Sequence, residues 1–113
     1  MKKLTKIQAS AKGEECTVRI NAIMCDPPET TVLAHKTDTI YPNSPRRCDA
    51  RAAYACQRCH DILDGRVRHD WLLWERAAIW GLAIERTHVR LVEKGLIKVD
   101  GIELGLPKLL KRR

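Results

Sequence analysis

The stretch Cys56-Gln57-Arg58-Cys59-His60 lies near the middle of this 113-residue chain and decides how the rest is interpreted. Two cysteines separated by two residues place their thiolates close enough to bind one zinc ion. His60 follows the second cysteine directly and is turned away from that zinc by one residue's rotation, so its imidazole is available for other chemistry. The stretch therefore predicts a zinc knuckle with a histidine beside it.

A second pair of cysteines, Cys16 and Cys25, could complete four sulfur ligands. Four thiolates suit tetrahedral Zn²⁺, and a site made only of cysteines has no open position, which is typical of structural zinc. The wider spacing of this pair requires the first part of the chain to fold back. Ordinary buried thiols are the alternative, and Cys48 could replace either upstream ligand. Otherwise Cys48 is expected to take no part in the site.

The composition describes a small basic protein with a small core. Hydrophobic residues make up 44% of the chain, but phenylalanine is absent, and a core of this kind is often helped by a metal. The 21 Lys and Arg against 14 Asp and Glu leave a net charge of +7. Such a surplus favours a polyanionic partner because each neutralised phosphate releases counterions. Simple solubility is the alternative explanation.

The start of the chain and its cysteines indicate a cytoplasmic protein that does not contact a membrane. Residues 1–14 are basic and polar, without the apolar segment of a signal peptide. No apolar run approaches the length of a transmembrane helix. In a reducing compartment, a tight Cys-x-x-Cys binds metal rather than forming a disulfide.

We expect one domain of the α+β class, held together by zinc, with a long helix added at its C-terminal end. Its parts are a loose basic arm over residues 1–13, a zinc-bound core of two strands and a helix over 14–64, a long helix over 70–95, and a basic tail over 100–113.

Local patterns predict the elements within these parts. Alternating and β-branched residues favour strands over 16–20 and 30–35, and a third over 52–55 precedes the knuckle. A helix is expected from residue 57 to about 63, before Gly65. Residues 36–50 have the proline and polar content of a loop.

The long helix is expected to begin at Asp70 as N-cap and to end at Lys94, before Gly95. A last short strand is predicted over 96–99. One face of the helix carries apolar residues at helical spacing, and these are Leu73, Ala77, Trp80, Ile84 and Leu91. Further apolar residues lie off this stripe, which indicates cover from more than one side, such as a second subunit.

Two histidines are candidates for chemistry. His60 and Asp64 are four residues apart on one helical face, and imidazole with carboxylate suits Mg²⁺ or Mn²⁺. His35 ends an apolar strand, and a neutral imidazole can take a proton from water near pH 7. Each alone could equally be a structural histidine. Asp61 is a rival carboxylate that diverges by about 100° from His60 on the helix.

Arginines surround these candidates in the sequence. Arg46, Arg47, Arg51 and Arg58 are the predicted nucleic-acid contacts, with Arg66 and Arg68 in the same region. Arginine can bind phosphate in a bidentate manner. These contacts would be to the backbone rather than to bases. A solvated charged face is the alternative.

Taken together, the chain resembles the HNH (His-Me finger, ββα-metal) endonucleases, and more closely the YbcO-like family of small phage and prophage proteins described as nucleases. The likeness covers about residues 10–99. The matching stretches are 13–20 (GEECTVRI), 28–35 (PETTVLAH), 55–61 (ACQRCHD) and 93–98 (EKGLIK).

The resemblance implies a ββα-metal domain in which His35 is the general base and His60 binds a catalytic divalent metal, Mg²⁺ or Mn²⁺. It places structural zinc on Cys16, Cys25, Cys56 and Cys59. Asp49 stands nearest to the asparagine of the HNH pattern, where it would orient His35 or touch the metal. Ala34 stands where many members carry another ligand, which leaves fewer protein ligands for that metal.

The function expected on this basis is metal-dependent hydrolysis of DNA phosphodiesters, in a bacterial host cell, by a phage or prophage protein. The resemblance also admits a second copy bound through helix 70–95 and a phage or host recombination protein as partners. The alternative is a non-catalytic zinc module that binds DNA or protein, which needs the cysteines and the charge but neither His35 nor His60.

Overall fold

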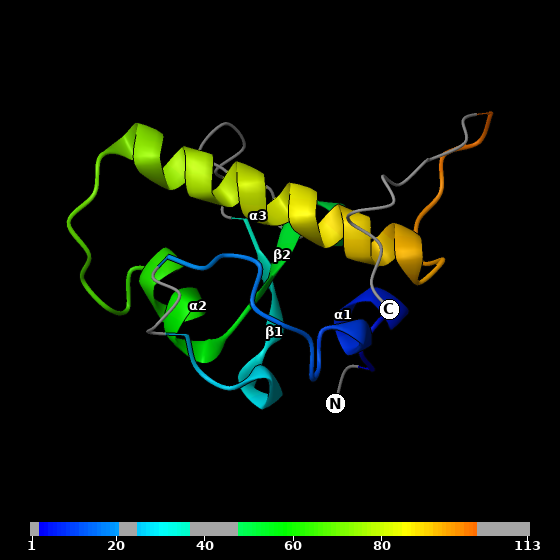
Figure 1. The fold of residues 1–113 in the computed structure, drawn as a ribbon, viewed down its shortest axis with the longest axis horizontal. Helices are drawn as coiled ribbons and strands as arrows, with labels where there is room; N and C mark the ends of the chain where they lie inside the picture. Colours follow the sequence, from blue (N-terminus) through cyan, green and yellow to red (C-terminus); the bar gives the residue numbers. More distant parts are fainter. Residues whose placement is uncertain (1–2, 21–24, 37–47, 102–113) are drawn as a thin grey trace.

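The computed structural model describes residues 3–20, 25–36 and 48–101 (Figure 1). It has a small α+β architecture with a two-stranded sheet and a long C-terminal helix, as predicted. In chain order the elements are α1 (Lys6–Ser10), the 3₁₀ turn η2 (Pro28–Thr30), β1 (Val32–His35), the 3₁₀ turn η3 (Asp49–Arg51), β2 (Ala52–Ala55), α2 (Gln57–Leu63) and α3 (Leu73–Glu93).

The centre of the fold is an antiparallel hairpin in which β1 pairs with β2 from Val32–Ala55 at one end to His35–Ala52 at the other. Every residue of β2 is buried, and α3 packs across it (Figure 1). Three of the four β2 residues are alanines, so the helix can approach the strand closely. The predicted strand 52–55 and helix 57–63 are both confirmed.

The outer edge of β2 is satisfied by threonines rather than by a further strand. Thr17 donates its backbone N–H (2.8 Å) and its hydroxyl (2.9 Å) to the carbonyl of Tyr54. The Tyr54 N–H donates to the hydroxyl of Thr87 on α3 (3.0 Å), which in turn donates to the carbonyl of Ala83. A buried network thus joins the first loop, the hairpin and α3.

The predicted strand over 16–20 is wrong, because this segment is irregular in the structure. Its β-branched pattern does bring Thr17 to the edge of β2. However, Arg19 adopts a left-handed backbone conformation with φ of 49°, which turns the chain away from the sheet. One residue therefore meets the strand edge where five were expected to.

The N-cap of the long helix is Leu72, two residues later than predicted. Asp70 is not its N-cap, since the Asp70 side chain is 92% exposed and pairs with Arg68. Instead, the Leu72 N–H donates to the side chain of Glu75, the third residue of α3. A carboxylate in the first turn satisfies an open amide and complements the helix dipole, as a polar cap would.

The buried face of α3 differs in part from the predicted stripe. Trp80 and Leu91 are buried as expected, whereas Ala77 is exposed. Ala83 and Thr87, which were not on the stripe, are fully buried against the hairpin. Ile84 is half-buried, and the side chain of Leu73 lies outside the described part.

The N-terminal arm and two predicted strands differ from the structure. The arm 1–13 contains the helix α1, stabilised by a capping box between Thr5 and Gln8. The strand predicted over 30–35 is shortened to Val32–His35 by η2, and residues 96–98 are irregular with a single bridge at Val99. Most of the basic tail lies outside the described residues.

Among the helices in the described part of the chain, each is too short or too polar to cross a membrane.

Candidate metal centre and active site

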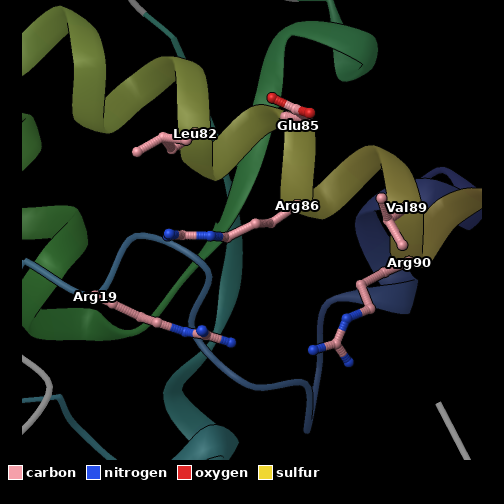
Figure 2. A pocket seen from close by; sticks show the side chains of 6 residues that line it. All are labelled: Arg19, Leu82, Glu85, Arg86, Val89 and Arg90. Carbon is pink, nitrogen blue, oxygen red and sulfur yellow. The ribbon is translucent and has the colours of Figure 1, made fainter. Parts of the chain in front are cut away.

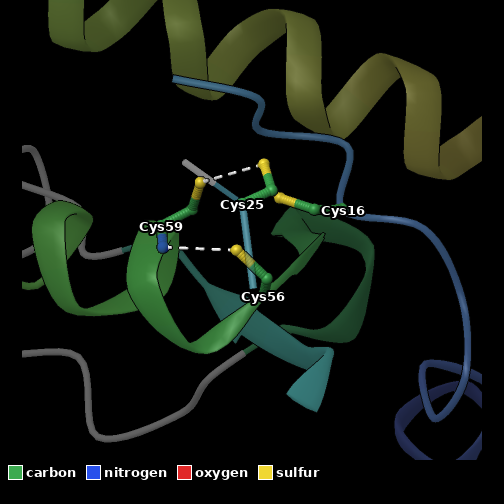
Figure 3. Close-up of side chains that lie close together, drawn as sticks. All are labelled: Cys16, Cys25, Cys56 and Cys59. Atoms are coloured by element: carbon green, nitrogen blue, oxygen red, sulfur yellow. Dashed lines mark hydrogen bonds between the residues drawn. The ribbon is translucent and has the colours of Figure 1, made fainter. Parts of the chain in front are cut away.

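Cys16, Cys25, Cys56 and Cys59 come together at the start of α2, with their sulfur atoms all within 4.8 Å of one another (Figure 3). The sulfurs of Cys25 and Cys59 are 3.8 Å apart. Four thiolates at ~2.3 Å from a tetrahedral zinc lie roughly 3.8 Å from each other, so the cluster has the dimensions of such a site. The four sulfurs could therefore hold a metal such as zinc.

The cluster is held by the way in which α2 begins. The Cys59 N–H points to the sulfur of Cys56, 3.5 Å away, at the first turn of the helix (Figure 3). The next two open amides are capped from the segment that carries Cys25, since Gln57 donates to the Thr30 hydroxyl (3.2 Å) and Arg58 to the Asp26 carboxylate (3.0 Å). These caps tie the segment to α2 and bring the thiols together.

The proton affinities of the thiols show why a cation suits this cluster. A hydrogen bond from Cys59 lowers the pKa of Cys16 to about 5. Burial, followed by the negative charge on Cys16, raises the pKa of Cys25 to about 11, and the bond to Cys16 together with burial also raises the pKa of Cys59. Several thiolates this close repel one another unless a positive ion compensates them, a charge that a metal ion such as Zn²⁺ could supply.

Cys48, the other cysteine, is exposed and is not part of the cluster. It replaces neither Cys16 nor Cys25, which answers the alternative left open by the spacing. The Cys-x-x-Cys motif could identify two of the ligands by local geometry. The upstream pair depended on how the first loop folds back.

His35 and Asp49 form a close pair at the end of the hairpin. The His35 Nε2 lies 2.7 Å from an Asp49 oxygen, and their side chains are 13% and 20% exposed. β1 ends at His35, and η3 begins at Asp49 directly before β2, so the hairpin itself brings the two together. Asp49, which was expected to orient His35 or to touch the metal, thus lies in contact with His35.

Asp49 is also held from α1 by residues that sequence reasoning did not consider. The Thr5 hydroxyl donates to one Asp49 oxygen at 2.8 Å, and the Gln8 amide donates to the other at 3.4 Å. Burial raises the pKa of Asp49, but the hydrogen bonds from His35 and Thr5 outweigh it and bring the pKa below its ordinary value. The Thr-x-x-Gln capping pattern at residues 5–8 was a signal for α1, though not for this contact.

His60 and Asp64 form a second pair on α2. The His60 Nε2 and an Asp64 oxygen are 3.0 Å apart, and both side chains are about three-quarters buried (22% and 24% exposed). Adjacent ligands of an octahedral ion at ~2.1 Å lie roughly 3.0 Å apart, so the spacing fits a pair of ligands. Arg66 approaches the same Asp64 oxygen at 3.6 Å. Asp61 faces Gln57 and Arg66 instead.

The two histidine–aspartate pairs are separate. Within the described ranges, the cysteine cluster is the only group of three or more metal-ligating side chains whose donor atoms lie within 4.8 Å of one another. His35 lies at the Ala52 end of the hairpin, whereas α2 starts beyond Ala55 at the opposite end. Each pair therefore offers two groups of its own rather than half of a four-residue cluster.

The remaining candidates lie around these pairs. Arg51 in η3 and Arg58 in the first turn of α2 are both exposed, whereas Arg46 and Arg47 lie outside the described residues. His69 stacks edge-on against Trp71 with ring centroids 4.8 Å apart. His88 contacts the carbonyl of Ala50 through Nε2 at 2.6 Å. His69 and His88 thus have structural contacts.

Residues 5–96 match the family described as "Putative nuclease YbcO". The chain belongs to this family. Proteins with the same description from Escherichia coli (strain K12) and from Enterobacteria phage 82 are each 34% identical to it over 97 residues, covering 84% of this chain and 99% of theirs.

A solved structure described as that of a "putative bacteriophage protein" from Escherichia coli strain K-12 also resembles the chain. The two are 35% identical, with a TM-score of 0.60, over 78% of this chain and 98% of the other. The matched family region includes all four clustered cysteines and both histidine–aspartate pairs.

Proposed function

We propose that this protein is a metal-dependent DNA endonuclease of the HNH type, of phage or prophage origin, which hydrolyses phosphodiester bonds. Its relatives are named as nucleases, which supports the general activity. The main structural support for an HNH-type mechanism is the 2.7 Å contact between His35 and Asp49 at the end of β1. A partly buried carboxylate that holds one nitrogen of an imidazole is an arrangement suited to general base catalysis.

In this proposal, His35 takes the proton of the attacking water. When Nε2–H donates to Asp49, the lone pair of the neutral ring lies on Nδ1, which is then the basic atom. Asp49 fixes that tautomer and stabilises the imidazolium that forms. Thr5 and Gln8 keep the carboxylate in place and ionised.

His60 and Asp64 are the proposed ligands of Mg²⁺ or Mn²⁺. Such an ion, when bound, would stabilise the charge that develops on the phosphate and on the leaving oxygen. This role requires the bound strand to reach both the His35 end of the hairpin and α2. Their 3.0 Å separation equals that of adjacent ligands, and metal binding would replace the direct contact between them. Arg51 and Arg58, with Arg46 and Arg47, would bind the DNA backbone beside the reacting phosphate.

Zinc on the four cysteines would have a structural role. It would join the first loop to the start of α2, so that His60 projects from a fixed helix. A site filled by four thiolates has no position left for a water or a substrate. The cluster therefore supports the active site without entering the reaction.

The test is nicking of supercoiled plasmid with Mg²⁺ or Mn²⁺, with and without chelator, by wild type and His35→Ala. We expect the substitution to lower the cleavage rate by ~10²–10⁴-fold, the usual worth of a general base. Zinc content and melting temperature should stay unchanged. His69→Ala is the matched control, because His69 is exposed and contacts Trp71 rather than the site.

Equal cleavage by wild type and His35→Ala would refute the role of His35. A shift of DNA mobility with no nicking by the wild type under any of these metals would instead favour the zinc module that only binds DNA or protein. The cysteine cluster and the net charge of +7 serve both functions equally.

The exposed apolar residues of α3 are the basis for proposing that two copies associate through this helix. Leu72, the N-cap of α3, and Trp74 in its first turn are 59% and 68% exposed. Large apolar side chains gathered at a surface are typical of interaction sites. Light scattering should give twice the monomer mass, and Trp74→Lys should return it to the monomer. A monomer in the wild type at micromolar concentration would contradict this.

A further inference from the structure

Three arginines that the active site does not use line a common cavity. Arg86 and Arg90 lie four residues apart on α3, and their side chains leave the helix on the side of the segment that carries Arg19 (Figure 2). The cavity has a volume of about 340 Å³. This volume is within the range of ligand sites, ~300–1,000 Å³. Its other walls are Leu82, Glu85 and Val89.

Two of the guanidinium groups are held in place by backbone carbonyls. Arg86 donates to the carbonyl of Thr17 at 2.9 Å, and Arg19 donates through Nε to the carbonyl of Cys16 at 3.1 Å. A carbonyl orients a guanidinium but does not neutralise it. Each group therefore keeps its full charge and further N–H donors, already positioned, which lowers the entropic cost of binding an anion.

Glu15 is the anion that now lies between two of these arginines. One of its carboxylate oxygens is 4.0 Å from Arg19 Nη2 and 3.9 Å from Arg90 Nη2. Both distances are at the limit of an ion pair, and the Glu15 side chain is 61% exposed. Exposed pairs of this kind contribute little, so a better anion can replace the carboxylate.

The guanidinium of Arg90 lacks a close anion and has one nitrogen without a hydrogen-bond partner among the described residues. Its side chain is only 16% exposed, and its Nη1 is buried with no hydrogen-bond partner among the described residues. A mostly buried guanidinium whose nearest carboxylate is at 3.9 Å is poorly compensated. A tighter anion beside it would lower that cost.

The backbone at Arg19 is a further sign of a functional constraint. Its φ of 49° is in the left-handed region, which non-glycine residues rarely adopt. Such conformations persist where the surrounding structure holds them, and they are common at functional sites. Arginine occupies this position although glycine would fit it without strain.

We propose that this arginine pocket (Arg19, Arg86 and Arg90) binds a phosphate group, with Glu15 standing in for the anion until the phosphate replaces it. Given the nuclease function proposed above, the source of that phosphate is the backbone of a bound nucleic-acid strand. With Glu15 and Glu85 counted, the pocket keeps a surplus of one positive charge, which suits a singly charged phosphodiester. Leu82 and Val89 offer an apolar wall for the sugar.

The test is the affinity for a labelled oligonucleotide, measured by fluorescence anisotropy without divalent metal, over a range of salt concentrations. Arg86→Gln should weaken binding about tenfold and reduce the slope of log affinity against log salt by about 1, as the loss of one phosphate contact does. Glu15→Gln should strengthen binding a few-fold, because it removes the competing carboxylate. Lys98→Gln, which removes an exposed positive charge outside the pocket, should change neither.

Arg19→Gly separates binding from folding. Glycine relieves the left-handed strain, so the melting temperature should stay equal or rise, while oligonucleotide affinity falls. Arg86 also holds the first loop through the Thr17 carbonyl, so Arg86→Gln could fail to fold. In that case Arg19→Gly alone tests whether the pocket binds the oligonucleotide. Structural damage cannot produce the opposite effect expected of Glu15→Gln.

Unchanged affinity and salt slope in Arg19→Gly and Arg86→Gln would overturn the proposal. Inorganic phosphate is the second probe: if it binds wild type in an Arg86-dependent manner while oligonucleotide affinity is the same in both proteins, the pocket takes free phosphate and the assignment to a strand is overturned. Arginine-dependent oligonucleotide binding by a protein that does not nick DNA would support the pocket and refute the nuclease. Nicking with arginine-independent binding would do the reverse.

Discussion

The four-cysteine cluster and the two histidine–aspartate pairs differ in how complete each is. Three of the four thiols are buried, and all four sulfurs lie within reach of one another, so one ion would satisfy the set. The histidine pairs each join one imidazole to one carboxylate and remain partly accessible. A saturated buried site stabilises a fold, whereas a site with open positions can bind water and substrate.

Cys59 and His60, which are adjacent on α2, show the same difference between a buried structural site and a partly accessible one. Cys59 is 2% exposed and belongs to the cluster, while the side chain of His60 is 22% exposed and faces Asp64. Successive residues on a helix diverge by about 100°, so one turn can present a structural ligand inward and a chemical group outward. Substitutions at these two neighbours should therefore have different consequences.

The largest effect is expected from Cys59→Ser, which breaks the cluster. A structural zinc contributes ~10 kcal/mol or more of binding free energy that is also folding free energy. Zinc content by elemental analysis should fall to near zero, and the cooperative thermal transition should be lost. Cys48→Ser is the matched control, and it should keep one zinc per chain and the wild-type melting temperature. Equal zinc content in both variants would remove the cluster from the metal site.

His60→Ala should leave zinc and folding intact but abolish the dependence of nicking on Mg²⁺ or Mn²⁺. The loss in rate should be a hundredfold or more, since a catalytic ion is worth several kcal/mol. Asp61→Asn serves as its control, because Asp61 contacts Gln57 and Arg66 rather than His60. If zinc is lost together with activity, the two neighbours do not have separate roles.

The buried hydrogen-bond network between the hairpin and α3 can be tested at Thr87. Its hydroxyl accepts from the Tyr54 N–H and donates to the Ala83 carbonyl. Thr87→Val keeps the shape but leaves the Tyr54 N–H unsatisfied, which should cost ~1–3 kcal/mol in urea unfolding. Thr31→Val offers a sharp contrast. The Thr31 hydroxyl is buried without a partner among the described residues, so the same change there should be neutral or stabilising.

The smallest effect is expected at Thr5, which supports the His35–Asp49 pair from α1. Thr5→Val removes both the cap of α1 and the bond to Asp49. It should lower stability by ~0.5–2 kcal/mol and cleavage by a few-fold, because His35 itself remains. Thr5→Ser keeps the hydroxyl and should restore both quantities. Cleavage at the wild-type rate in Thr5→Val would show that Asp49 does not need this support.

The outcome for the predicted elements follows the range of the interactions that form them. β2, α2 and most of α3 were predictable because local spacing and composition specify them. The prediction of a strand over 16–20 was wrong, since only Thr17 meets the edge of β2 and Arg19 turns the chain. The predicted start of α3 was also wrong, because Glu75 takes the capping role expected of Asp70.

By itself, the sequence determined the Cys-x-x-Cys knuckle, the His60–Asp64 spacing and the surplus of positive charge, since each depends on neighbours within one helical turn or on composition alone. Only the tertiary structure decided that Asp49 meets His35 and Thr5, and that Arg19 shares a cavity with Arg86 and Arg90. These contacts join residues 14 to 71 positions apart. No local period encodes them, because they exist only once the loops have closed and the hairpin and α3 have packed.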